Sequence, residues 1–298
     1  MSDMRLTRGV KLRDLKKQMV FILTSFGIEK GEASVEAEMI VEHVSGMNRS
    51  QQLVCADIPI TDRQTAKMER YILQRQARMP IQYCLEVADF AGFKFKVKHG
   101  VFIPRTDTET LLEEALRLCG KLGDRPVIKV LEVGVGSGAL SVSLLKKMPR
   151  TRLTGTDISE DALSITLENA RQHKVLKRIN LKHEGLWWLL DERFDLVICN
   201  PPYIPLSEKE SLEPEVVEYE PHEALFGRDP DGLRFYRKLS TTIPKMIDLA
   251  GGYMAVEVGD KQADKVQEIF KEAGWGSLNC QRDVNGISRV VSGSWMKK

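Results

Sequence analysis

The sequence predicts an α/β protein in which a seven-stranded, mostly parallel sheet follows a small helical region. Residues 12–78 carry apolar side chains at helical spacing, whereas from residue 127 onward short apolar runs alternate with longer amphipathic stretches. Strands that alternate with helices form a mainly parallel sheet covered by helices on both faces. We therefore expect a ligand at the carboxyl ends of the strands, where the strand order reverses.

Length and composition predict a globular protein of about two domains. The chain has 298 residues, 42% of them hydrophobic and 29% charged, with a net charge of +2; domains usually hold about 100–200 residues. No apolar run approaches the ~20 residues that span a bilayer, which excludes an integral membrane protein. The balanced charge argues against a broad nucleic-acid-binding face, because such a face needs clustered Lys and Arg.

The helical region is predicted to contain a helix over residues 31–46, which Gly46 ends, and a second helix from Thr61 to just before Pro80. Alternating residues then predict a hairpin, because Phe93 and Phe95 face one way with lysines between them. The predicted domains are residues 1–86 and 102–298, joined by a hairpin over residues 87–101. Seven strands are expected over residues 127–133, 152–156, 179–183, 194–199, 252–258, 278–281 and 287–291.

The first 20 residues are rich in Arg and Lys and allow two interpretations. They could be the remnant of an organellar presequence, or the exposed side of a first helix. Asp3 and Asp14 favour the helix, because such presequences contain few acidic residues.

Cysteines and histidines show no metal-binding pattern. No two cysteines form a C-x-x-C pair, and none has a histidine at ligand spacing. We expect free thiols and no metal site. The cysteines are Cys55, Cys84, Cys119, Cys199 and Cys280.

A glycine-rich loop follows the first predicted strand of the sheet. Residues 131–138 read Leu-Glu-Val-Gly-Val-Gly-Ser-Gly, and such glycines permit a tight turn and close approach of a ligand to the backbone. Asp157 ends the next strand, where a carboxylate can accept hydrogen bonds from ribose hydroxyls. The third glycine comes one position early for a dinucleotide fingerprint, which favours S-adenosylmethionine over NAD. The alternative for Asp157 is a capping acid for the following helix.

The segment Asn200-Pro201-Pro202-Tyr203 follows the fourth predicted strand. Two prolines hold the chain extended and leave its carbonyls free as acceptors. Asn200 adds a side-chain acceptor, and Tyr203 adds a flat face for a planar group. Such a site can hold a planar NH2 group with its lone pair towards an electrophilic methyl carbon. In isolation, the same residues would also suit a rigid turn with a surface tyrosine.

Together with Phe102-Ile103-Pro104-Arg105-Thr106-Asp107-Thr108-Glu109, these two segments resemble the HemK/PrmC family of release-factor glutamine N5-methyltransferases. The resemblance covers nearly the whole chain. F-I-P-R-x-x-T-E upstream of the glycine loop is its most specific part, whereas N-P-P-Y also occurs in DNA and RNA amino-methyltransferases. Further matching segments are Arg78-Met79-Pro80-Ile81-Gln82-Tyr83, Glu213-Pro214-Glu215-Val216, Tyr219-Glu220-Pro221 and Asp231-Gly232-Leu233.

The resemblance implies a class I (Rossmann-like) methyltransferase sheet behind a helical domain that docks the substrate. Its cofactor would be S-adenosylmethionine, and its partner a class 1 peptide-chain release factor whose Gly-Gly-Gln glutamine is methylated. We expect a monomer without sequence-specific nucleic-acid binding. The wording of the motifs is closer to the animal, organellar branch, which implies a mitochondrial location, with a cytoplasmic one as the alternative.

The resemblance also assigns the site residues. The cofactor would be held by Glu132, Gly134, Val135, Gly136, Ser137, Gly138, Asp157, Glu184, Gly185 and Asn200. The catalytic residues would be Asn200, Pro201, Pro202 and Tyr203. The substrate pocket would be lined by Phe102, Pro104 and Arg105.

This sequence departs from the family pattern at three places. Thr106 replaces a common proline, and Arg228 replaces the second glycine of a Gly-Gly pair. Glu184 and Gly185 stand where an acid and an aromatic residue are common near the adenine. Trp187 or Trp188 could supply the missing aromatic packing, although both could equally be core residues.

Two alternative functions remain at this point. The planar-amine chemistry would also suit methylation of adenine or guanine in DNA or RNA, although no basic or aromatic-rich recognition segment is present. The chain could also be a catalytically silent module that only docks a translation factor. The intact glycines, Asp157 and Asn200 argue against this possibility.

Overall fold

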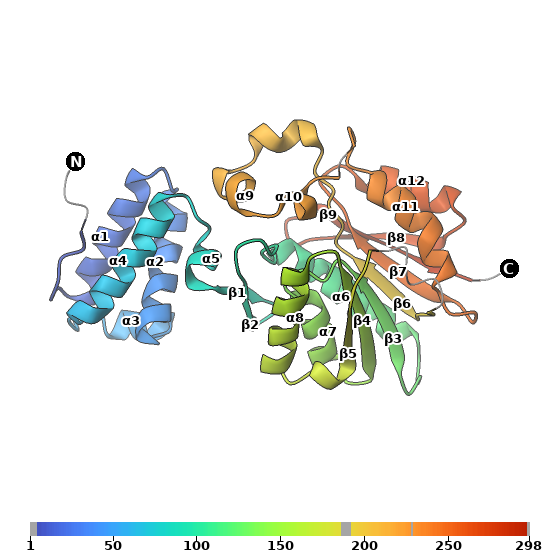
Figure 1. The fold of residues 1–298 in the computed structure, drawn as a ribbon, viewed down its shortest axis with the longest axis horizontal. Coiled ribbons are helices and arrows are strands. Elements are labelled where there is room, and N and C mark those ends of the chain that lie inside the picture. The colour runs from blue at the N-terminus through green and yellow to red at the C-terminus, as the bar shows by residue number, and fades with distance from the viewer. Residues whose placement is uncertain (1–4, 186–191, 228, 297–298) are drawn as a thin grey trace. The chain divides into compact units, whose positions relative to one another are not determined.

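The computed structural model describes residues 5–185, 192–227 and 229–296 of the chain (Figure 1). Its contacts divide the chain into two compact units. The helical unit comprises Met1–Glu86 and Pro214–Tyr219, and the sheet unit comprises Val87–Glu213 and Glu220–Lys298. The sheet unit is therefore interrupted once, by a short segment that packs with the helical unit.

Local sequence signals fix the ends of the helices in the helical unit. The carboxylate of Glu29 accepts two backbone N–H bonds at the start of α2, and Gly46 ends this helix with a φ of 76°. Thr61 and Gln64 form a capping box at the start of α4. A further helix, α5, follows Pro80 and was not predicted. The helices are α1 (Leu12–Ser25), α2 (Lys30–Ser45), α3 (Arg49–Val54), α4 (Asp62–Gln76), α5 (Ile81–Leu85) and α9 (Pro214–Tyr219).

Helix α1 is an integral part of this unit. Leu12, Leu15 and Met19 are completely buried, whereas the side chains of Arg13 and Lys17 remain 49% and 78% exposed. The basic residues therefore lie on the exposed side of a packed helix, which favours the second interpretation of the N-terminal sequence.

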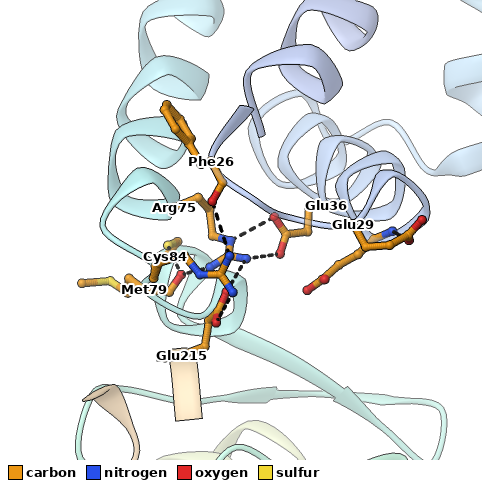
Figure 2. A network of polar contacts seen from close by, with 9 residues as sticks. Phe26, Glu29, Glu36, Arg75, Met79, Cys84 and Glu215 are labelled. Atoms are coloured by element: carbon orange, nitrogen blue, oxygen red, sulfur yellow. Dashed lines mark hydrogen bonds and ion pairs between the residues drawn. The ribbon is translucent and has the colours of Figure 1, made fainter. Parts of the chain in front are cut away.

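A buried ion-pair network centres on Arg75 of α4 (Figure 2). Its guanidinium donates from Nε to Oε2 of Glu36 at 2.9 Å, and its Nη2 lies 2.8 Å from Oε1 of the same carboxylate. Nη1 donates to the carbonyl of Met79 at 2.6 Å. The side chain of Arg75 is 1% exposed and that of Glu36 is 3% exposed. All three nitrogens of the guanidinium thus have a partner, which buried charge requires.

The same network holds the segment Pro214–Tyr219 in the helical unit. Oε1 of Glu215 lies 3.2 Å from Nη2 of Arg75, and its Oε2 lies 2.6 Å from Nη2 of Arg78 (Figure 2). The hydroxyl of Tyr219 also donates to the carbonyl of Ala77. This segment lies within residues 102–298, the range predicted for the methyltransferase domain, whereas its contacts place it in the helical unit.

The second unit is built on a seven-stranded sheet of order β5-β4-β3-β6-β7-β9-β8. The first five strands in this order are parallel, whereas β9 runs antiparallel to both neighbours. The prediction of seven mostly parallel strands is confirmed. The strands are β3 (Ile128–Val133), β4 (Thr151–Asp157), β5 (Ile179–His183), β6 (Leu196–Cys199), β7 (Gly252–Glu257), β8 (Gly276–Arg282) and β9 (Ser288–Trp295). A separate hairpin consists of β1 (Val87–Phe90) and β2 (Phe93–Lys96).

Two hydrophobic cores cover the two faces of this sheet. Successive strand residues alternate between them, as Val130 faces one core and Leu131 the other. Helices α6 and α7 pack in the first core, and α11 and α12 in the second. The α-helices described in this unit are α6 (Glu109–Lys121), α7 (Ala139–Lys147), α8 (Glu160–Gln172), α10 (His222–Leu225), α11 (Arg234–Thr242) and α12 (Ala263–Glu272). Short 3-10 helices among the described residues are η1 (Thr106–Thr108), η2 (Leu176–Arg178), η4 (Leu206–Ser211) and η5 (Ile243–Lys245).

None of the helices within the described residues combines the length and the apolar character needed to cross a membrane.

The helical unit should be sensitive to loss of one partner in its buried network. Glu36→Ala leaves the Arg75 guanidinium buried without its main counter-ion, and we expect a loss of about 3–5 kcal/mol. Hydrogen exchange of peptides from α2 and α4 would measure this loss in the full chain. Asp57→Ala is the matched control, because within the described part of the chain Asp57 forms ion pairs only with Lys11 and Arg13, whose side chains are exposed. Equal hydrogen-exchange protection of α2 and α4 in both variants would contradict a stabilising role for the buried Glu36–Arg75 pair.

Candidate active site

A cavity of about 390 Å³ lies at the carboxyl ends of β3, β4 and β6 in the sheet unit. These are the central strands, on either side of the point where the strand order reverses. The glycine loop after β3, Asp157 at the end of β4 and Asn200 after β6 all line it.

The glycine loop presents bare backbone to the cavity. Gly134 and Gly136 have φ of 77° and 55°, in the left-handed region that favours glycine. A Cβ built on either residue would meet no atom within 4 Å. A side chain here would project into open space, so a ligand can reach the backbone. Val135 and Ser137 line the cavity beside them.

Gly138 has a different role from the other two glycines. It does not line the cavity, and a Cβ there would lie 2.8 Å from the side chain of Thr166 on α8. Its φ of 76° begins helix α7. The family resemblance predicts a cofactor contact for Gly138, whereas its geometry indicates a role in the close packing of α7 against α8.

Asp157 connects the glycine loop to the next helix. Its Oδ2 accepts from the backbone N–H of Gly136 at 2.9 Å, and its Oδ1 accepts from that of Ser159 at 2.9 Å. Ser159, rather than Asp157, caps α8, because its hydroxyl accepts from Ala162 N. Burial raises the pKa of Asp157. Backbone N–H groups of Gly136, Ser159 and Ile158 bond to this carboxylate. Since a carboxylate has about four acceptor positions, it keeps capacity for a hydroxyl of a ligand in the cavity.

Glu132 also lines the cavity but is 3% exposed. Its carboxyl forms a hydrogen bond with the hydroxyl of Ser141 at the start of α7. Burial raises its pKa to about 8, so it holds its proton up to neutral pH. Glu132 therefore presents a neutral carboxyl beneath the glycine loop.

Glu184 and Gly185 follow β5, are partly exposed and line the cavity. Trp187 and Trp188 lie outside the described residues.

Asn200 lines the cavity immediately after β6, and its amide is oriented by Thr108. Nδ2 donates to Oγ1 of Thr108 at 3.2 Å. Across the described part of the chain, Oδ1 has no hydrogen-bond partner. Pro201 and Pro202 line the cavity beside it and contribute no N–H. This edge of the cavity therefore carries acceptors.

Tyr203 is held at both its backbone and its side chain. Its hydroxyl donates to Oε1 of Glu257 at 3.2 Å, and its carbonyl accepts from Nε2 of Gln262 at 3.0 Å. Gly232 is required beside it, because a Cβ there would lie 2.1 Å from the Tyr203 carbonyl oxygen. The tyrosine is therefore fixed at the wall of the cavity.

The segment before α6 forms another wall. Phe102 and Pro104 line the cavity, whereas Arg105 does not. Arg105 instead pairs with the buried carboxylate of Glu220, and its Cζ lies 5.2 Å from the centre of the Phe102 ring. Glu220 also accepts from the N–H of Ile103 at 3.3 Å. Arg105 and Glu220 thus hold the segment that carries the pocket residues.

Sequence reasoning did not assign a role to Thr108, Glu220 or Glu257. Thr108 and Glu220 lie within segments that match the family, and this match is the signal that could have found them. Glu257 ends β7 and is 1% exposed. Nothing in the neighbouring sequence distinguishes Glu257 from an ordinary residue at the end of a strand.

These features fit S-adenosylmethionine. Bare loop backbone can contact the ligand closely, Asp157 can accept from a ribose, and no phosphate cradle is needed. Among the residues that the structure describes, no group of three or more His, Cys, Asp or Glu could hold a metal ion.

Comparison with known proteins agrees with this geometry. Residues 17–85 match the family model of the PrmC N-terminal domain, and residues 93–218 match that of the methyltransferase small domain. A methyltransferase from Pyrococcus furiosus of known structure is 16% identical, with a TM-score of 0.50 over 78% of this chain and 100% of that chain. This likeness concerns the fold.

Two bacterial relatives carry the name release factor glutamine methyltransferase. The protein from Geobacter sulfurreducens is 38% identical over 89% of this chain and 91% of its own length. The protein from Fusobacterium nucleatum is 34% identical over 86% of this chain and 72% of its own length. The chain therefore belongs to the release factor glutamine methyltransferase family, whose members are S-adenosylmethionine-dependent enzymes.

Proposed function

We propose that this protein transfers the methyl group of S-adenosylmethionine to the side-chain amide nitrogen of the Gly-Gly-Gln glutamine in a class 1 peptide-chain release factor. One observation carries this proposal. The acceptor edge at Asn200 and Pro201 lines the same cavity as the glycine loop and Asp157. An acceptor-rich edge beside a nucleoside site suits a substrate that presents a planar NH2 group.

The chain's own residues supply position and charge. S-adenosylmethionine, when bound, supplies a methyl carbon attached to a positively charged sulfur. Oδ1 of Asn200 and a proline carbonyl accept the two N–H bonds of the substrate amide, which directs the nitrogen lone pair away from them. The ring of Tyr203 supports the planar amide by stacking.

No strong base is needed at this site. A carboxamide nitrogen is a poor nucleophile because its lone pair is delocalised, and positive charge develops on it as the methyl group arrives. The acceptors at Asn200 and Pro201 stabilise this charge. The nitrogen gains the methyl group as the carbon–sulfur bond breaks, with its electron pair left on sulfur to give S-adenosylhomocysteine, and the nitrogen then loses one proton to solvent. We expect this chemistry to proceed without a metal ion.

The location and assembly of the protein are further proposals. We propose a mitochondrial location, supported by the resemblance of its motifs to the organellar branch, and a monomeric state. Cell fractionation with a tagged protein and light scattering of the purified protein would test them. A cytosolic signal or a stable dimer would contradict them.

The substrate can be tested directly. The protein should methylate a purified class 1 release factor, and changing its Gly-Gly-Gln glutamine to alanine should abolish the transfer. Mass spectrometry of the factor after incubation with labelled cofactor would identify the residue. Undiminished labelling of the mutant factor, or efficient methylation of naked DNA or RNA, would overturn the proposal.

The cofactor and substrate ends of the cavity should respond differently to mutation. Asn200→Ala should leave the cofactor Kd nearly unchanged and lower kcat by about 10²–10³-fold, because one positioned polar group is lost. Asp157→Ala should mainly raise the cofactor Kd. Calorimetry and steady-state kinetics would separate the two effects. Asp161→Ala is the control, because Asp161 pairs with Lys98 and does not line the cavity. The reverse pattern would mean that the two ends have been exchanged.

A further inference from the structure

The orientation of the Asn200 amide is a choice between two chemically opposite states. Rotation by 180° about the terminal bond exchanges the amide oxygen and nitrogen with almost no change in shape. Only one state presents an acceptor to the cavity. In the opposite state, Asn200 would present its N–H donors to the substrate NH2 group. Because both groups would then be donors, no hydrogen bond could form between them.

Thr108 contacts the nitrogen end of this amide. Its side chain is buried and its Oγ1 lies 3.2 Å from Nδ2 of Asn200. A hydroxyl can donate or accept, so Thr108 alone does not determine which end of the amide it meets. Its proton must go elsewhere for the oxygen to accept from Nδ2.

The buried carboxyl of Glu257 is the group that can take this proton. It is 1% exposed, and the Thr108 hydroxyl lies against it and lowers its pKa as a hydrogen-bonding partner. Burial is the largest influence and raises this pKa to about 7. An ionised carboxylate can only accept. Above this pKa the carboxyl is ionised, so it directs the Thr108 proton towards itself and leaves the oxygen lone pairs for Asn200.

The same carboxyl also accepts from the hydroxyl of Tyr203 at 3.2 Å. Its Oε2 is buried and, over the described residues, has no hydrogen-bond partner. Glu257 is thus joined through hydroxyls to both polar side chains of the Asn200–Tyr203 segment, although it does not itself line the cavity.

The turn that carries Thr108 is held independently of Asn200. Oδ2 of Asp107 lies 2.8 Å from Nη2 of Arg289, and Arg289 also donates from Nε to Asp283 at 3.0 Å. Thr108 makes no side-chain capping bond to α6. Loss of its hydroxyl should therefore leave the turn and the helix in place.

We propose that Thr108 and Glu257 are positioning residues that fix the direction of hydrogen bonding, so that Asn200 presents its oxygen to the substrate amide. In this arrangement Nδ2 of Asn200 donates to the Thr108 hydroxyl, and the Thr108 hydroxyl donates to the Glu257 carboxylate. This inference rests on the proposed function, because it specifies how the same site becomes an acceptor site for NH2.

The test is a double-mutant cycle on the full chain with release factor as substrate. Thr108→Val keeps the shape and removes the hydroxyl, so kcat should fall about tenfold, as expected for one hydrogen bond. The KM for the factor and the cofactor Kd should stay within about twofold, since uniform binding is untouched. Thr108→Ser restores the hydroxyl and should restore kcat.

The decisive variant combines Thr108→Val with Asn200→Ala. If Thr108 acts through Asn200, the double variant is no slower than Asn200→Ala alone. Glu257→Gln, whose amide can donate towards Thr108, should lower kcat and be equally non-additive with Asn200→Ala. Cofactor binding by each variant verifies that the site is folded.

The outcomes separate this inference from the proposed function. Wild-type turnover in Thr108→Val, or multiplicative losses in the double variant, would overturn the positioning role. No rescue by Thr108→Ser would do the same. If Asn200→Ala itself retains full kcat, or the factor is never methylated, the proposed function fails instead.

Discussion

The register of three parallel strands is the constraint on which the site depends. Val133 of β3 pairs with Thr156 of β4 on one side and with Cys199 of β6 on the other. The residues that follow these three are Gly134, Asp157 and Asn200. They therefore emerge at one level of one sheet edge, although they are far apart in the sequence. A shift of one residue in either pairing would turn every side chain of the shifted strand to the opposite face, and the cofactor end would no longer meet the acceptor edge.

This dependence explains which parts of the site could be predicted. Asn200 follows the apolar run of β6, and Asp157 comes directly after the strand predicted over residues 152–156, so strand recognition alone places both at the carboxyl ends of the strands. Gly138 shows the limit of such reasoning, because a loop pattern cannot distinguish a glycine that meets a ligand from one that Thr166 requires for helix packing. Glu257 also ends a strand, but its importance comes from contacts with two hydroxyls. Such contacts depend on tertiary packing and have no local periodicity.

The segment Pro214–Tyr219 was beyond prediction for a different reason. Its sequence does not set it apart from the loop after Tyr203, and its partners follow from contacts made by Glu215 and Tyr219. Arg75 is buried with Glu36 in the helical unit, and its Nη2, which lies 2.8 Å from Glu36, is shared with Glu215 at 3.2 Å. Glu220 follows directly and belongs to the sheet unit, where it holds Arg105. The two carboxylates are five residues apart, so the chain that anchors the reaction pocket is continuous with a segment anchored in the helical unit.

Buried carboxyl groups recur around the cavity, and their cost requires a reason. Removing a carboxylate from water is unfavourable, as the raised pKa values of Glu132 and Glu257 indicate. Hydrophobic residues of similar volume would often serve stability equally well. Glu257 above its pKa differs in accepting without donating, and it can therefore set the direction of the hydroxyls linked to it and of the amide beyond them. A site that must distinguish an NH2 group from an oxygen depends on that direction. The burial of Glu257 therefore fits a polar network maintained for hydrogen-bond polarity.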